Sequence, residues 1–102
     1  MGLIKPNNYS TEEIKFSRIA NALGHPARTR IIELFQEELL VTQTSLVSYL
    51  NLNKASVHRH INCLRRADLL LNKYRIHYDK LHLNEETLKQ FQKHLQKLSK
   101  PL

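Results

Sequence analysis

Residues 46–70, LVSYLNLNKASVHRHINCLRRADLL, decide the fold of this chain. They indicate a helix, a tight turn and a second helix. The turn falls at Asn51, because asparagine accepts a positive φ more readily than most residues, and Asn53 can cap the helix that follows. In that helix, apolar residues at spacing i, i+4 and i+7 predict a buried stripe, formed by Val57, Ile61 and Leu64. The stretch is therefore expected to pack as two short helices joined by a turn.

The second of these helices has a basic polar side. It carries cationic and hydrogen-bonding side chains at Lys54, Ser56, His58, Arg59 and Arg65. No acidic residue occurs between Glu38 and Asp68. A compact helical element with such a face suits the phosphate-lined major groove of double-stranded DNA. We therefore predict DNA contacts at these five positions, with the first four at or near the base edges.

The positive charge of the chain is unevenly distributed. The sequence of 102 residues has a formal net charge of +7. Residues 1–53 hold five basic and five acidic side chains, residues 54–80 hold seven basic and two acidic ones, and residues 81–102 hold four lysines and two glutamates. A localised basic block favours a polyanionic partner, although a solvated basic face is the alternative on charge alone.

Composition and cysteine count bound the class of protein. A chain of 102 residues with 41% apolar residues suits one domain with a modest core. We expect a flexible arm at residues 1–9, the domain at 10–99 and a tail at 100–102. The single cysteine, Cys63, excludes an internal disulfide framework and a cysteine-based zinc finger. The sequence predicts no membrane span and no signal peptide, so a cytoplasmic protein is expected.

An enzymatic function is disfavoured by what the sequence lacks. There is no paired-carboxylate arrangement and no G-x-S-x-G nucleophile motif, and two glycines are too few for a phosphate-cradling loop. RNA binding is possible on charge, but the aromatic residues do not form a stacking platform. The sequence therefore predicts a binding protein that is not an enzyme.

A helix is predicted between Ser10 and Leu23. Ser10 and Glu13 form a capping-box pattern, which satisfies two of the free N–H groups at a helix start. Gly24 is expected to end the helix, because glycine tolerates the left-handed conformation that is common at helix C-termini. The first helix of the domain therefore covers about thirteen residues (roughly three to four turns).

Two further helices are predicted before the basic one. The first spans residues 27–40, and the second ends at Leu50 with Thr44 or Ser45 as its cap. Arg28 lies near the start of the first of them, where the helix dipole disfavours a cation. A bound phosphate and a solvated side chain explain such a charge about equally well. We assign Arg28 as a predicted phosphate contact.

A small β-hairpin is predicted after the basic helix. Its strands fall at residues 70–73 and 78–83, with the tip at residues 74–77, although no Asn-Gly or Asp-Gly pair defines the turn. The hairpin carries a basic flap made of Lys73, Arg75, His77 and Lys80. The two lysines and the arginine of this flap are predicted phosphate contacts.

A last helix is predicted after Asn84, which can cap it. Its apolar residues alternate steps of three and four, as in an a/d seam, at Leu88, Phe91, Leu95 and Leu98. Such a seam packs either on its own domain or against a partner helix. The predicted fold is therefore mostly α with a small β-hairpin, in the order of four helices, hairpin and helix.

Three motifs together resemble the ArsR/SmtB-like transcriptional regulators. The first is ALGHPARTRIIELF at residues 22–35, which is similar to the family's entry motif Ala-Leu-x-His-Pro-x-Arg-x-Arg-Ile. The second is residues 46–70, which resemble the family's helix–turn–helix, and the third is the hairpin ending at residues 81–83. The resemblance covers residues 14–83. Helix–turn–helix patterns also suit MarR-like and other winged domains.

The resemblance implies a winged helix–turn–helix fold and a homodimeric repressor that binds a pseudo-palindromic operator in double-stranded DNA. Two recognition helices would enter successive major grooves about 34–36 Å apart, and the wings would touch phosphates. Dimer contacts would come from the first and last helices, at Phe16, Leu88, Phe91, Leu95 and Leu98.

The sequence departs from the sensing motifs of the family. Many members bind a metal through a Cys-x-Cys motif on the positioning helix, but residues 38–48, ELLVTQTSLVS, contain no cysteine. The last helix offers Glu85, Glu86 and His94 without the paired histidine spacing of other members. Members that sense persulfide use two cysteines, and Cys63 is alone, so we read it as a half-buried packing residue. No metal site and no cofactor are predicted, and the effector is undefined.

Two alternatives to this hypothesis remain open. The chain could be a winged-helix protein–protein interaction module whose basic face is incidental. It could also be a metal-responsive member that uses a His/Glu site not evident in the pattern. Asn51 and Asp68 stand where the family usually has glycine, so the turn and the exit from the recognition helix are expected to be set in another way.

Overall fold

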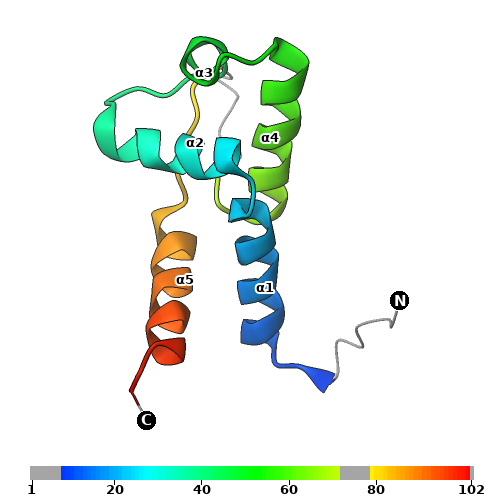
Figure 1. The fold of residues 1–102 in the computed structure, drawn as a ribbon, viewed down its shortest axis with the longest axis vertical. Coiled ribbons are helices and arrows are strands. Elements are labelled where there is room, and N and C mark those ends of the chain that lie inside the picture. The colour runs from blue at the N-terminus through cyan, green and yellow to red at the C-terminus, as the bar shows by residue number, and fades with distance from the viewer. Residues whose placement is uncertain (1–7, 72–78, 102) are drawn as a thin grey trace.

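Five α-helices form the part of the protein that the structure, a computed structural model, describes: residues 8–71 and 79–101. Their bounds are α1 (Thr11–Leu23), α2 (Pro26–Glu37), α3 (Gln43–Leu50), α4 (Lys54–Arg66) and α5 (Glu85–Leu98). Figure 1 shows α2, α3 and α4 grouped at one end of the molecule, with α1 and α5 side by side at the other. The five predicted helices are therefore confirmed.

The first helix begins as predicted but ends by a different mechanism. Ser10 and Glu13 form the capping box, with the Ser10 Oγ accepting from the Glu13 N–H at 3.0 Å. Gly24 follows the last helical residue, yet its φ of −71° is right-handed, so the prediction of a left-handed glycine cap was wrong. Side chains of α2 satisfy the free carbonyls instead: Thr29 Oγ1 donates to Leu23 O at 2.7 Å, and Arg28 Nε donates to Ala22 O.

Helix α2 ends earlier, and α3 begins earlier, than the sequence predicted, because the residues between them pair with a distant segment of the chain. The second helix ends at Glu37, not at residue 40, and Thr42 caps α3, not Thr44 or Ser45. The chain leaves the helix early because Val41 must reach the core, where it is 2% exposed. Its carbonyl oxygen then accepts from the Leu81 N–H at 2.8 Å.

The turn between α3 and α4 has the predicted conformation. Asn51 adopts a left-handed φ of 53°, and Asn53 caps α4 by accepting from the Ser56 N–H at 2.8 Å. The buried stripe of α4 is also confirmed, since Val57, Ile61 and Leu64 are 0–1% exposed. This stripe packs against α1, α2 and α3 and forms the centre of the core.

The exit from α4 is set by Asp68, which has a φ of 64°. The Leu69 N–H bonds to Leu64 O at 3.0 Å and the Asp68 N–H to Arg65 O at 2.9 Å, the two bonds of a Schellman motif. Aspartate is one of the few side chains that tolerates this conformation. Its Oδ2 accepts from the buried Thr87 hydroxyl at 3.2 Å, which fastens the exit of α4 to the start of α5.

The β-hairpin is not confirmed, because residues 8–71 and 79–101 contain no strand. They do contain two isolated antiparallel bridges, Leu70↔Leu83 and Thr42↔Lys80. The Leu71 N–H also donates to His82 O at 2.8 Å. The base of the predicted hairpin is therefore paired, and its tip lies outside the described residues.

Replacing Asp68 tests the role assigned to its conformation. Asp68→Ala is expected to lower the free energy of unfolding by about 1–2 kcal/mol, because alanine lacks the local hydrogen bonding that offsets a left-handed φ. Asp68→Gly should be more stable than the alanine variant, since it relieves that strain and loses only the bond to Thr87. Urea denaturation measures both, with Thr87→Val as the control for the bond alone. Equal stability of the alanine and glycine variants would contradict this account.

Candidate nucleic-acid interface

The N-terminal half of α4 presents an exposed basic face. Because Val57 and Ile61 point into the core, the residues on the opposite side of the helix point outward. Lys54, His58 and Arg59 are exposed, and Ser56 is partly buried. Figure 1 places this half of α4 beside α3 at one end of the molecule. The four residues predicted at or near the base edges thus lie on the first two turns of α4, where Lys54 shares the line of buried Ile61 and is exposed because it begins the helix.

Two of these four side chains are ordered by contacts within the helix. Arg59 Nη2 donates to Ser56 Oγ at 3.0 Å, and the backbone of Ser56 is held by the Asn53 cap. An arginine that is already positioned loses less conformational entropy when it binds. The pair therefore offers a guanidinium of the kind that reads guanine.

Arg28 is turned toward the inside of the domain. Its Nε donates to Ala22 O, and its Nη1 lies 3.4 Å from His60 Nδ1. Although Arg28 belongs to the first turn of α2, its side chain therefore lies at the C-terminal end of α1, where the helix dipole favours positive charge. This contact gives Arg28 a structural role, and its phosphate contact stays a prediction.

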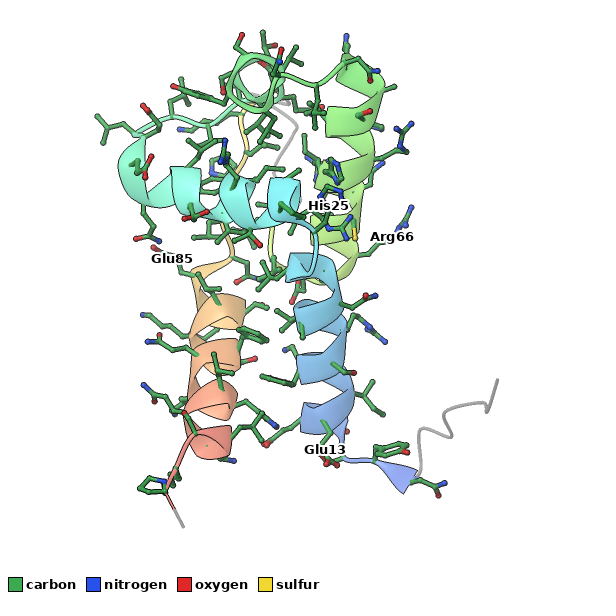
Figure 2. All side chains as sticks on the ribbon, viewed as in Figure 1. Glu13, His25, Arg66 and Glu85 are labelled. Carbon is green, nitrogen blue, oxygen red and sulfur yellow. The ribbon has the colours of Figure 1, made fainter. Side chains whose placement is uncertain are left out.

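His60 lies in a positively charged, partly buried cluster. Its ring contacts the ring of His25, with centroids 4.5 Å apart, and His25 itself caps α2 by accepting from the Ala27 N–H at 3.0 Å. Figure 2 shows His25 between the start of α2 and α4. Burial, followed by the nearby charges of His25, Arg28 and Arg59, lowers the pKa of His60.

The remaining predicted contacts are placed in different surroundings. Lys80 is half-buried beside Thr42, and Lys73 and Arg75 lie outside the described residues, as does His77. Arg65 is half-buried on the side of α4 that faces α1. Only the residues of the first half of α4 therefore form a shared, outward-facing group in the described part of the chain.

Arg66 is an exposed cation that was not predicted as a DNA contact. It follows Arg59 by seven residues, or about two turns, so both lie on the outer line of α4. Figure 2 shows Arg66 on the outer side of this helix, away from α2 and α5. The helical spacing from Arg59 was the signal that could have identified it.

The predicted dimer residues separate into two groups. Phe16 stacks on Phe91 with centroids 4.8 Å apart and on His94 at 4.3 Å, so α1 and α5 pack against each other within one chain. Further along α5, Leu95 and Leu98 are 48% and 65% exposed. Leu88 and Phe91 pack against the chain's own core, whereas the last two positions of the seam are uncovered.

Metal sites and membrane spans are two other features by which such a chain could act. Within residues 8–71 and 79–101, no three histidine, cysteine, aspartate or glutamate side chains lie together as a metal site requires. None of the described helices is both long and apolar enough to span a bilayer. Cys63 is half-buried against the core, as predicted.

Comparison with known proteins finds a family that matches part of the chain. Residues 25–70, which include α2, α3 and α4, match the model of the bacterial regulatory protein, arsR family. The predicted resemblance is confirmed for this segment. This similarity supports a DNA-binding transcription regulator.

The fold also resembles a solved structure, a MarR protein from Peptoclostridium difficile. The two chains are 14% identical with a TM-score of 0.55, and the similarity covers 95% of this chain and 72% of the other. At this identity the likeness concerns the fold alone, and it agrees with a winged-helix architecture. No curated protein sequence matches the chain significantly.

The lowered pKa of His60 predicts a pH dependence of folding. Because the folded state resists protonation of His60, the unfolded state binds more protons as the pH falls below about 6.5. The free energy of unfolding should therefore decrease as the pH falls from 7 to 5. His60→Gln should show a smaller decrease in urea titrations over the same range, and His58→Gln serves as an exposed control. If His60→Gln lost as much unfolding free energy between pH 7 and pH 5 as the unaltered protein, the lowered pKa of His60 would not be the cause.

Proposed function

We propose that this protein is a sequence-specific DNA-binding transcription regulator that acts as a homodimer, and as a repressor, on a pseudo-palindromic operator. The observation that carries the proposal is the exposed, acid-free first half of α4, where Arg59 and Ser56 are joined on a helix held by Asn53. It lies within the segment that matches the arsR family. The repressor role and the form of the operator rest on the family resemblance.

Base recognition is assigned to Lys54, Ser56, His58 and Arg59. An arginine reads guanine through two hydrogen bonds in the major groove, and serine can donate or accept at any base edge. Lysine and histidine at the start of the helix add positive charge near the phosphates. The predicted flap cations Lys73, Arg75 and Lys80 supply sequence-independent phosphate contacts in this proposal.

The proposed homodimer uses the uncovered end of α5. Leu95 and Leu98 expose apolar surface beside α1, and burying such side chains against a second copy is favourable at about 25 cal/mol per Å². Two copies joined there would each carry a recognition helix at the opposite end of the domain. The arrangement supports binding to two half-sites.

A second candidate function is a protein–protein interaction module. Exposed apolar side chains around the α2–α3 connection favour it: Leu39 is 106% exposed, Leu40 53% and Tyr49 45%. A gel-shift titration with random DNA at two salt concentrations separates the candidates. Absence of any complex at low salt would favour the module over the regulator.

Arg59→Ala tests the assignment of base reading. The variant should lose about 1–3 kcal/mol of binding free energy on the operator, because a bidentate contact to a base is removed. It should also discriminate less between the operator and random DNA, both measured by fluorescence anisotropy at fixed salt. The operator is first obtained by selecting bound fragments from a random pool.

Arg30→Ala is the matched control for Arg59→Ala. Arg30 is an exposed arginine on α2, outside the outward face of α4. Replacing Arg30 lowers the net charge by the same amount as replacing Arg59. It should leave the discrimination between the operator and random DNA unchanged. If Arg59→Ala and Arg30→Ala discriminate equally well, the base-reading role of Arg59 is wrong.

Leu98→Glu tests the proposed dimer surface. A buried carboxylate at the interface should weaken self-association by about 30-fold or more, since even 2 kcal/mol corresponds to that change. Sedimentation equilibrium measures the dimer dissociation constant, and circular dichroism confirms that the fold is retained. Leu39→Glu is the control, because Leu39 is more exposed but lies on the α2–α3 connection. Equal effects of the two substitutions would refute the proposed surface.

A further inference from the structure

A basic hollow lies between α1 and the C-terminal end of α4. Its volume is about 510 Å³. The polar side chains that line it are Thr11, Lys15, Arg18, Arg65, Arg66 and Asp68. It opens at the C-terminal end of α4, six residues, or about 9 Å of helix, beyond Arg59, the last residue of the proposed DNA-reading face.

Arg65 has an unpartnered buried donor in this hollow. Its Nε is enclosed and makes no hydrogen bond to any atom of residues 8–71 and 79–101. Buried polar groups in folded proteins nearly always have a partner, and a charged group without one is costly. The enclosed Nε is out of reach of a ligand, but no other atom of the half-buried Arg65 guanidinium pairs with the described residues either, so its outer nitrogens are free to bind an anion in the hollow.

The charges around the hollow are not balanced by carboxylates. Across the described parts of the chain the one ion pair joins Lys97 to Glu12, at 3.8 Å, so no carboxylate lies within 4.0 Å of the cationic nitrogens of Arg18, Arg65 or Arg66. The carboxylate of Asp68 accepts from Thr87, and that of Glu13 accepts from Ser10.

We propose that this hollow binds a small organic phosphate, and that this ligand is the effector of the regulator. Guanidinium groups bind phosphate oxygens through paired, charge-assisted hydrogen bonds, and three arginines line this hollow. A volume of about 510 Å³ exceeds that of a single inorganic phosphate and lies in the range of small-molecule sites. The effector role rests on the proposed function.

The position of the hollow gives a bound phosphate a direct effect on DNA binding. It lies between α1, which packs against α5, and α4, which carries the proposed reading face. A ligand that bridges Arg18 of α1 and Arg65 of α4 would bias the angle between these two helices. Coupling of this kind commonly changes a second affinity by about 5-fold or more.

The test uses the full chain and pyrophosphate as the probe. Isothermal titration calorimetry at constant ionic strength, with sodium chloride replacing pyrophosphate in the reference, should show saturable binding of one pyrophosphate per chain. Amide shifts in nuclear magnetic resonance spectra should concentrate at residues 14–18 and 65–68. Arg18→Gln and Arg66→Gln, both at exposed positions, should each weaken binding by about tenfold.

Arg30→Gln is the matched control, since Arg30 is exposed and does not line the hollow. Equal pyrophosphate affinity of Arg18→Gln, Arg30→Gln and the unaltered protein would overturn the site, as would amide shifts confined to residues 54–59. Arg18→Gln should also leave the salt dependence of DNA binding unchanged in the absence of pyrophosphate. A salt slope lowered by about one would mean that Arg18 contacts a DNA phosphate, and would overturn the small-molecule site.

The effector role has a separate readout. Saturating pyrophosphate should change the operator affinity of the unaltered protein by about 5-fold or more, and that of Arg18→Gln by much less at the same concentration. An unchanged operator affinity would refute the effector role. Pyrophosphate binding without any DNA binding would support the phosphate site and refute the proposed function, so the two failures are distinguishable.

Discussion

The burial of one stripe of α4 is the constraint on which the rest of the structure depends. Val57, Ile61 and Leu64 are almost fully enclosed, and α4 packs through them against α1, α2 and α3. Burying three such side chains fixes the rotation of the helix about its axis, because any other rotation would expose them to water. The direction in which Arg59 points is therefore a consequence of the core, which also sets the direction of the proposed DNA-reading face.

Polar contacts at helix ends then set how the other helices meet α4. Thr29 and Arg28, at the start of α2, satisfy the last carbonyls of α1, and Arg28 also reaches His60 on α4. At the other end of α4, Asp68 holds the start of α5 through Thr87. Because buried backbone groups must be paired, these few side chains restrict the angles between α1, α4 and α5. The helices proposed to dimerise are thus fastened to the helix proposed to read DNA.

Local signals in the sequence predicted the features that depend on neighbouring residues. The capping box at Ser10, the left-handed Asn51 and the cap at Asn53 each involve residues at most three apart, and the structure confirms all three. The end of α2 and the cap of α3 were mispredicted, because pairing with residues 79–81, nearly forty positions away, determines where residues 41–43 lie. Likewise, no local pattern could show that Arg28 turns inward or that Arg65 is half-buried on the side of α4 that faces α1.

Arg28 on α2, together with Arg59 and Arg65 on α4, shows why net charge alone is a poor guide to function. Arg28 donates to the Ala22 carbonyl oxygen and lies beside His60. Arg59 is exposed on a helix face, and Arg65 is half-buried with an enclosed Nε that has no acceptor. A protein that needed only a positive surface for DNA would gain nothing from half-burying Arg65, since a partly buried cation with an enclosed, unpaired donor costs stability. The cost is reasonable if an anion occupies the hollow for part of the time and offsets it. Since α4 would then contact both ligands, a change in its angle to α1 would couple them without a longer chain of residues.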